Sequence, residues 1–411
     1  MAKLQGNTTK LPEKHPAKKI CKMCKIFYNN IFMQFIDHIS KNQAYFNFYQ
    51  NINKFCQLEV KANDIEKLGY VPREIWQKMG SANLLGITVA KEFLGQELSI
   101  PYHLIAMTVI SSHLPALGLS YGAHSNLCVH QLHKYGTDTQ KLRYLPKLVT
   151  GEFVGALAMT EVNAGSDVLN MQMSAVDDGQ GNYILNGRKM WITNGPCADV
   201  IIVYARTQAN AITAFIVDKT CPNWFPAQSI NKLGMKGSET SELVFNNCPI
   251  PKTNVLGEIN KAKYILMDGL NTERLVLSGG PLGIMEKCLK LMHKYMNDRQ
   301  QFNKSIGSFQ LMQAKIAECY AAFASTSAWA MQIAEAEDIN RHDPTALLML
   351  ASSHASKIAS ETIQTFGGNG YSEDYEAARL YRDAKLYEIG AGTNEIRKSL
   401  VGRYLLDEKY D

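Results

Sequence analysis

The β-strand pattern of this chain lies in four short runs: Asn182-Tyr-Ile-Leu185, Val200-Ile-Ile-Val-Tyr204, Ile212-Thr-Ala-Phe-Ile-Val217 and Glu242-Leu-Val-Phe245. They are rich in β-branched and aromatic residues and are bounded by Gly, Asn, Asp and Pro, as strands joined by turns usually are. Together they predict a β-rich segment over about 158–260.

Helical periodicity flanks this segment on both sides. Apolar residues recur at helical spacing over 31–39, and helical patterns continue to about residue 155; they resume at Lys261 and include 310–336. The order is therefore α, β, α without alternating βαβ units. This order argues against Rossmann and P-loop folds, and neither GxGxxG nor GxxxxGK[ST] occurs. Gly279-Gly-Pro-Leu-Gly283 falls in a helical stretch, and we interpret it as a site of close helix packing or a kink.

Composition narrows the class of protein further. Hydrophobic residues make up 46% of the 411 residues and charged residues 20%, which is typical of a globular chain with two or three packed units. No apolar run approaches the roughly 20 residues that a membrane helix needs, so no membrane insertion is expected.

The positive charge is concentrated at the N-terminus. Residues 1–25 contain seven lysines and one acid, a charge of +6, which leaves −1 on the other 386 residues. A nucleic-acid-binding protein usually carries its positive charge on the folded body, so no nucleic-acid partner is expected. A basic, acid-poor leader is loosely typical of organelle import, and we expect 1–25 to be a disordered or targeting segment.

Cysteine and histidine spacing predicts no metal site. Among nine cysteines, Cys21-Lys-Met-Cys24 is the only CxxC pair, and it lacks the second pair that zinc requires. His130-x-x-His133 has no third ligand of a known motif. We therefore expect reduced cysteines in a reducing compartment.

Five motifs occur in order along the chain from residue 157 onward: Leu157-Ala-Met-Thr-Glu-Val-Asn-Ala-Gly-Ser-Asp167, Trp191-Ile-Thr193, Arg299-Gln-Gln-Phe302, Gln364-Thr-Phe-Gly-Gly-Asn-Gly370 and Gly392-Thr-Asn-Glu395. With the α–β–α order, they resemble the acyl-CoA dehydrogenases from about residue 58 to the end.

The resemblance implies an α+β fold in three domains after the leader at 1–25. These are an N-terminal helical domain at 26–156, a middle β-barrel or sandwich domain at 157–260, and a C-terminal four-helix bundle within 261–411.

Three further segments are most similar to the isovaleryl branch of this family: Leu119–Cys128, Glu273–Gly283 and Lys385–Thr393. This likeness implies FAD-dependent αβ-dehydrogenation of a short branched acyl-CoA, with isovaleryl-CoA from leucine catabolism as first choice. Electrons would pass to electron-transferring flavoprotein. The resemblance also implies a homotetramer, a dimer of dimers, in the mitochondrial matrix.

The same resemblance identifies the catalytic base. Most members carry a glutamate in an Ile-Tyr-Glu-Gly-Thr segment, where this chain has Ile389-Gly-Ala-Gly-Thr393, so that Ala391 replaces the carboxylate. The isovaleryl and long-chain branches place the glutamate on a central helix, which here contains Glu273. Glu388 is the nearest rival, and we interpret it as structural because the isovaleryl branch has a glutamate there too.

Other roles are implied by the resemblance alone. The cofactor-binding residues would be Leu157, Ala158, Met159, Thr160, Gly165, Ser166, Trp191, Ile192, Thr193, Arg299, Gln310, Gln364, Thr365, Phe366, Gly367, Gly368, Thr393, Asn394 and Glu395, of which Arg299, Gln310 and 364–368 would reach the FAD of a neighbouring subunit. The substrate-binding residues would be Ser166, Tyr264, Asn271, Thr272, Arg274, Gly390, Ala391 and Gly392.

Departures from the family pattern keep other functions open. Val162 replaces a usual Pro, Asn303 a usual Gly, and Pro115 interrupts an expected helix in the domain that helps to wall the acyl pocket. A long-chain acyl-CoA dehydrogenase and a non-catalytic FAD-binding relative are therefore alternatives. An acyl-CoA oxidase is a third, although oxidases usually carry an extra C-terminal helical domain for which this chain is expected to be too short.

Overall fold

The computed structural model describes residues 39–209 and 211–406. The predicted leader, most of the helical pattern at 31–39 and the Cys21–Cys24 pair lie outside this part of the chain. No helix in the described part is long and apolar enough to cross a membrane.

The N-terminal domain consists of helices. Its elements are α3 (Gln43–Glu59), α4 (Ala62–Leu68), α5 (Arg73–Ser81), η1 (Lys91–Phe93), α6 (Ile100–His113), α7 (Pro115–Gly122), the π-helix η2 (Ala123–His130), α8 (Gln131–Tyr135) and α9 (Asp138–Val149). Helix α6 is apolar on nearly all sides and forms the centre of this domain. The expected interruption at Pro115 is present, because α6 ends at His113 and Pro115 begins α7, where its missing N–H costs nothing.

The middle domain is built on one sheet. Its elements are β1 (Gly155–Ala158), η3 (Val168–Asn170), β2 (Ser174–Asp177), β3 (Asn182–Thr193), η4 (Gly195–Cys197), β4 (Val200–Gln208), β5 (Ala211–Asp218), β6 (Trp224–Ser229), β7 (Thr240–Pro251), η5 (Lys252–Asn254) and β8 (Val255–Leu256). Over the described residues the strand order is β6-β7-β3-β2-β4-β5-β8, and β1 pairs with β4 in parallel. All four predicted runs lie within strands, in β3, β4, β5 and β7.

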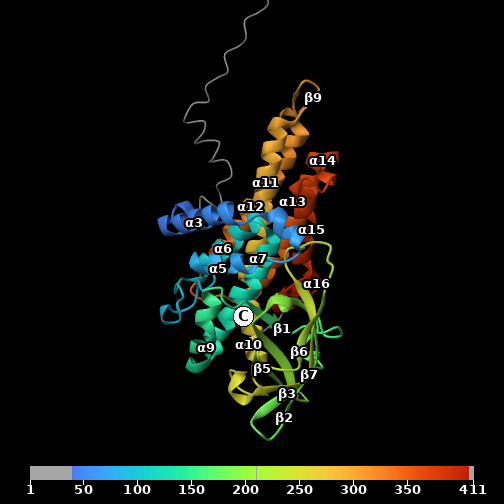
Figure 1. Ribbon diagram of the computed structural model, residues 1–411. Helices are drawn as coiled ribbons and strands as arrows, with labels where there is room; N and C mark the ends of the chain where they lie inside the picture. The colour runs from blue at the N-terminus through green and yellow to red at the C-terminus, as the bar shows by residue number, and fades with distance from the viewer. Residues whose placement is uncertain (1–38, 210, 407–411) are drawn as a thin grey trace, which may run out of the picture.

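The C-terminal domain returns to helices. Its elements are α10 (Ala262–Leu277), α11 (Gly279–Asp298), β9 (Gln300–Gln301), β10 (Lys304–Ser305), η6 (Ile306–Ser308), α12 (Gln310–Ala334), α13 (His342–Phe366), α14 (Gly368–Tyr371), α15 (Glu376–Ala384), η7 (Lys385–Glu388) and α16 (Asn394–Leu406). Figure 1 shows α11 and α12 projecting away from the sheet and ending at β9, at the opposite end of the molecule. The predicted α–β–α fold is confirmed.

The two helical domains share one core because α11 packs directly on α6. A Cβ at Gly283 would lie 2.4 Å from the Thr108 carbonyl oxygen, and one at Gly280 would lie 2.2 Å from the Tyr387 hydroxyl. Only glycine permits these approaches. The interpretation of 279–283 as close helix packing is correct.

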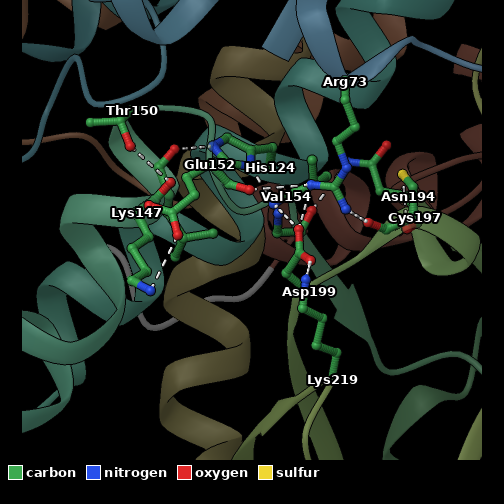
Figure 2. Close-up of polar contacts among 12 residues, drawn as sticks. Arg73, His124, Lys147, Thr150, Glu152, Val154, Asn194, Cys197, Asp199 and Lys219 are labelled. Carbon is green, nitrogen blue, oxygen red and sulfur yellow. Dashed lines mark hydrogen bonds and ion pairs between the residues drawn. The ribbon is translucent and has the colours of Figure 1, made fainter. Parts of the chain in front are cut away.

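Asp199 joins the N-terminal domain to the sheet (Figure 2). Its buried carboxylate accepts hydrogen bonds from Arg73 of α5 at 2.5 Å, from Lys219 at 2.5 Å and from the Val154 N–H at 2.8 Å. Arg73 also donates to the Cys197 carbonyl at 2.7 Å. Although burial opposes ionisation, these donors hold the pKa of Asp199 below its usual value.

A second polar contact holds strand β1 against the π-helix. Burial lowers the pKa of His124 to about 3, so the ring is neutral. Its Nδ1 accepts from the Gly155 N–H at 2.9 Å, and its Nε2 donates to the Leu148 carbonyl at 3.1 Å. Asn194 donates to the carbonyls of Ser120 and Gly155 at 2.9 and 3.1 Å. The first and third strands are thereby fixed against one helical wall.

Candidate functional site

A cavity of about 770 Å³ lies where the three domains meet. Its size falls within the range of small-molecule sites. Fourteen of the residues predicted from sequence line it together: Leu157, Met159, Thr160, Gly165, Ser166, Trp191, Ile192, Thr193, Glu273, Arg274, Gly390, Ala391, Gly392 and Thr393. Segments more than 200 residues apart in the sequence thus face one cavity. Asn394 and Glu395 line a smaller adjoining cavity of about 260 Å³.

The remaining predicted residues do not line the main cavity. Ala158 is buried in β1, and Tyr264, Asn271 and Thr272 lie on α10 beside it. Arg299, Gln310 and 364–368 lie at the ends of α11, α12 and α13, far from the sheet (Figure 1). Within one chain these last residues are therefore separated from the cavity.

Glu273 projects from α10 into this cavity and is only 8% exposed. Its Oε2 is buried and has no hydrogen-bond partner among the described residues. Burial raises its pKa to about 7, against the opposing charges of Arg274 and Arg397. An unpaired carboxylate with a pKa near neutrality is suited to accept a proton from a bound ligand.

Glu388 has a different environment. It does not line the main cavity, and it forms an ion pair with Lys385 at 2.5 Å. Partial burial pushes its pKa upward, but the hydrogen bond and charge of Lys385 hold the pKa below its ordinary value. Such a carboxylate stays ionised and engaged, which favours the structural role.

Part of the cavity is lined by β1, the loop that follows it and the end of β3. Trp191 is 56% exposed and has φ +64°, an uncommon backbone conformation for a bulky side chain. A Cβ at Gly165 would meet nothing within 4 Å, so the loop is open there. An exposed indole beside an open glycine loop and a large apolar cavity fits a flat aromatic cofactor such as a flavin.

Lys189 and Glu161 form a buried ion pair behind this wall. Lys189 donates to Glu161 at 2.8 Å and to the Met159 carbonyl at 3.0 Å, while Glu161 accepts from the backbone N–H groups of Gln172 and Met173 at 2.6 and 2.9 Å. The pair thereby fixes the course of the 157–167 motif. Sequence reasoning missed Lys189, although a lysine inside an otherwise half-buried strand is a signal that could have been noticed.

Asn126 and Arg397 were also missed. Asn126 belongs to the π-helix, lines the cavity, and has a buried Oδ1 without a partner among the residues described. Local π-helical turns frequently occur at functional sites. Arg397 is fully buried behind 387–394. No sequence pattern marked either residue.

Comparison with known proteins identifies the family to which this chain belongs. Profiles of the acyl-CoA dehydrogenase N-terminal, middle and C-terminal domains match residues 44–152, 156–248 and 263–406. The chain belongs to the acyl-CoA dehydrogenase family and is a flavin-dependent oxidoreductase, as the sequence motifs predicted.

Individual relatives and solved structures show which members of the family this chain is similar to. Mitochondrial isovaleryl-CoA dehydrogenase of Solanum tuberosum is 47% identical over 88% of this chain and 90% of its own length. A mitochondrial 2-methylacyl-CoA dehydrogenase of the same organism is 47% identical over 87% and 89%. Among solved structures, butyryl-CoA dehydrogenase from Megasphaera elsdenii superposes with a TM-score of 0.84 at 30% identity, covering 88% of this chain and 97% of that one.

Proposed function

We propose that this protein catalyses FAD-dependent αβ-dehydrogenation of a short branched acyl-CoA, with isovaleryl-CoA as the first choice. The observation that carries the proposal is Glu273: a buried, unpaired carboxylate in the cavity of a chain whose Ala391 replaces the usual catalytic glutamate. The relatives named isovaleryl-CoA and 2-methylacyl-CoA dehydrogenase support a branched acyl group.

In this proposal Glu273 removes the substrate α-proton, and the Ala391 N–H donates a hydrogen bond to the thioester oxygen. That hydrogen bond is needed because the α-proton of a free thioester is too weakly acidic for a carboxylate at neutral pH. When bound, FAD supplies the hydride acceptor. The surrounding apolar walls exclude water, and Asn271, Thr272 and Arg274 of α10 would contact the substrate together with Tyr264.

The residues that would hold FAD come from two groups. Leu157, Met159, Thr160, Gly165, Ser166 and Trp191–Thr193 line one part of the main cavity, with Ala158 buried behind them in β1, and Thr393–Glu395 lie at the start of α16. We propose that Arg299, Gln310 and 364–368 complete the site of a neighbouring subunit, because within their own chain they lie far from it.

Small residues at the cavity wall favour a branched substrate. Gly390 and Ala391 stand where straight-chain members carry tyrosine and glutamate, which leaves lateral room near the acyl α- and β-carbons. A turnover screen of straight and branched acyl-CoAs tests this directly. We expect isovaleryl-CoA to have the highest kcat/KM, and a markedly better long straight acyl-CoA would favour the long-chain alternative.

We further propose electron-transferring flavoprotein as the electron acceptor and the mitochondrial matrix as the location. The location rests on the relatives, several of which are mitochondrial proteins. The acceptor rests on the family resemblance. Turnover with oxygen alone would favour an acyl-CoA oxidase, and turnover with neither acceptor would favour a non-catalytic relative.

The decisive experiment replaces the base. Glu273→Gln preserves size and polarity but cannot take the proton, so turnover should fall by about 10²–10⁴-fold or more. FAD content and acyl-CoA binding should persist. Adding Ala391→Glu should restore part of the activity, with a bias toward straight-chain substrates because the new side chain fills the branch space. The matched control is Glu388→Gln, and near-normal turnover by Glu273→Gln would transfer the assignment to Glu388.

A further inference from the structure

Arg397 of α16 is completely buried, yet it does not line the cavity. Its Nη1 donates to the Tyr387 carbonyl and to Asn394 Oδ1, each at 2.8 Å. Its Nη2 donates to the Gly390 carbonyl. The guanidinium thus lies behind the segment that brings Gly390, Ala391 and Gly392 to the cavity, and it holds that segment by its backbone oxygens.

The carbonyl that Arg397 binds belongs to the same peptide group as the Ala391 N–H. This peptide is trans, like all those described, so its C=O and N–H point in opposite directions. With the Gly390 oxygen fixed on Arg397 behind the wall, the Ala391 N–H is directed away from Arg397, to the side on which Gly390, Ala391 and Gly392 line the cavity.

Two observations indicate that this N–H is kept available for a ligand. It has no hydrogen-bond acceptor in the described part of the chain. Ala391 and Gly392 also have φ of +56° and +89°, two consecutive left-handed residues of which the alanine is strained. Strained backbone persists where the surrounding structure holds it, and functional sites are where it concentrates. Arg397 supplies that restraint.

A cation bonded to a carbonyl also polarises the amide, which makes its N–H a stronger donor. We infer that Arg397 is a positioning residue that aims and polarises the Gly390–Ala391 peptide, so that the Ala391 N–H stabilises negative charge on the thioester oxygen. This inference rests on the proposed function and adds to it the group that makes the donor effective.

The charge of Arg397 also acts on the carboxylate of Glu273. The charged and titratable groups facing Glu273 are Arg274 on its own helix, Arg397 on α16 and Tyr204 on β4. Loss of the Arg397 charge should therefore raise the pKa of Glu273, and the acidic limb of the pH–kcat profile should move to higher pH.

The test is the carbonyl stretch of bound 3-methylcrotonyl-CoA, the unsaturated product of isovaleryl-CoA, carrying ¹³C at the thioester carbon. In FAD-loaded wild-type protein we expect a shift to lower frequency relative to the free thioester. Arg397→Gln should reverse most of this shift, and its kcat should fall by about 10- to 100-fold with a smaller change in KM. Arg397→Lys, whose shorter ammonium side chain cannot span both carbonyls, should be intermediate.

The matched control is Arg379→Gln. Arg379 is also buried, at 5% exposure, and donates to Asn63 and Glu376, but it does not line the cavity. Its variant should lower thermal stability and leave the carbonyl frequency unchanged.

A wild-type frequency in folded, FAD-loaded Arg397→Gln overturns the inference. If that variant does not fold, a wild-type frequency and kcat in Arg397→Lys overturn it instead. Failure of the Glu273 assignment would give a different result. The Glu273→Gln variant would then still dehydrogenate acyl-CoA, while the carbonyl frequency shift of the bound product would be unchanged.

Discussion

At Glu273, the proposed base, burial of the carboxyl group also destabilises the fold at neutral pH. Its pKa is raised from 4.5 to about 7, so between these values the folded protein binds a proton that the unfolded chain has released. The stability from this group is fully present below pH 4.5 and is lost as pH rises through about 7. The loss at pH 8 amounts to about 3 kcal/mol.

Glu273→Gln should therefore be more stable than wild type at pH 8, and the difference should shrink toward pH 5. Thermal midpoints of the two proteins, measured across this range with FAD bound, check it. Glu388→Gln should behave oppositely, because the pKa of Glu388 is lowered and its contribution is present above pH 4.5. A pH-independent difference for Glu273→Gln would contradict the raised pKa.

The role of some residues can be predicted from the sequence, whereas the role of others depends on the folded structure. Glu273 could be predicted as the base because Ala391 replaces the alternative carboxylate, and this comparison needs only the residue types at two positions. Arg397 could not be found this way, since its role depends on the direction of one peptide group packed against α16. Lys189 is similar: its partner Glu161 lies on another segment, and only folding brings the two together.

At the scale of elements, the glycines of α11 set how closely it packs on α6 and on η7. Gly280→Ala would place a methyl group 2.2 Å from the Tyr387 hydroxyl, in a helix start that is buried on all sides. We expect a loss of about 1–3 kcal/mol in the free energy of unfolding, since such a core cannot expand freely.

Gly402→Ala is the control for that experiment. Gly402 also lies in a helix, α16, but a Cβ there would meet nothing within 4 Å. The substitution should stabilise the helix by up to about 1 kcal/mol, because alanine has the higher helix propensity. Equal effects of the two substitutions on the melting temperature would rule out the packing argument.

Strands with a clear hydrophobic pattern could be predicted from the sequence, whereas elements shaped by tertiary contacts could not. The runs in β3 and β7 alternate between buried and less buried residues, as half-buried strands do. The runs in β4 and β5 are continuous and β-branched, because these strands are buried on both faces. The π-helix at 123–130 has no such signature; it continues α7 into α8 and is seen only in the folded backbone. The parallel pairing of β1 with β4 likewise depends on register rather than on composition.

At the scale of the whole molecule, the end farthest from the sheet presents apolar side chains to solvent. Phe302, Leu311 and Tyr371 are each more than 80% exposed there, and Arg299 lies beside them at the end of α11. Large exposed apolar side chains gathered at one end are typical of an interaction surface. They support the proposal that this end meets another copy of the chain.

The assembly proposal predicts that FAD binding and subunit association fail together. If Arg299 reaches the cofactor of a neighbouring subunit, its planar fork would bind a pyrophosphate bidentately, and bound FAD would stabilise the interface by mass action. Arg299→Ala should therefore lose FAD and shift the proposed homotetramer toward smaller species at micromolar concentration. Sedimentation velocity with flavin absorbance detection measures both at once. Arg341→Ala, at the opposite end of α13 from Gln364, should keep both tetramer and flavin. A wild-type monomer with fully bound FAD would refute the proposal, because no neighbouring subunit would then be needed to complete the site.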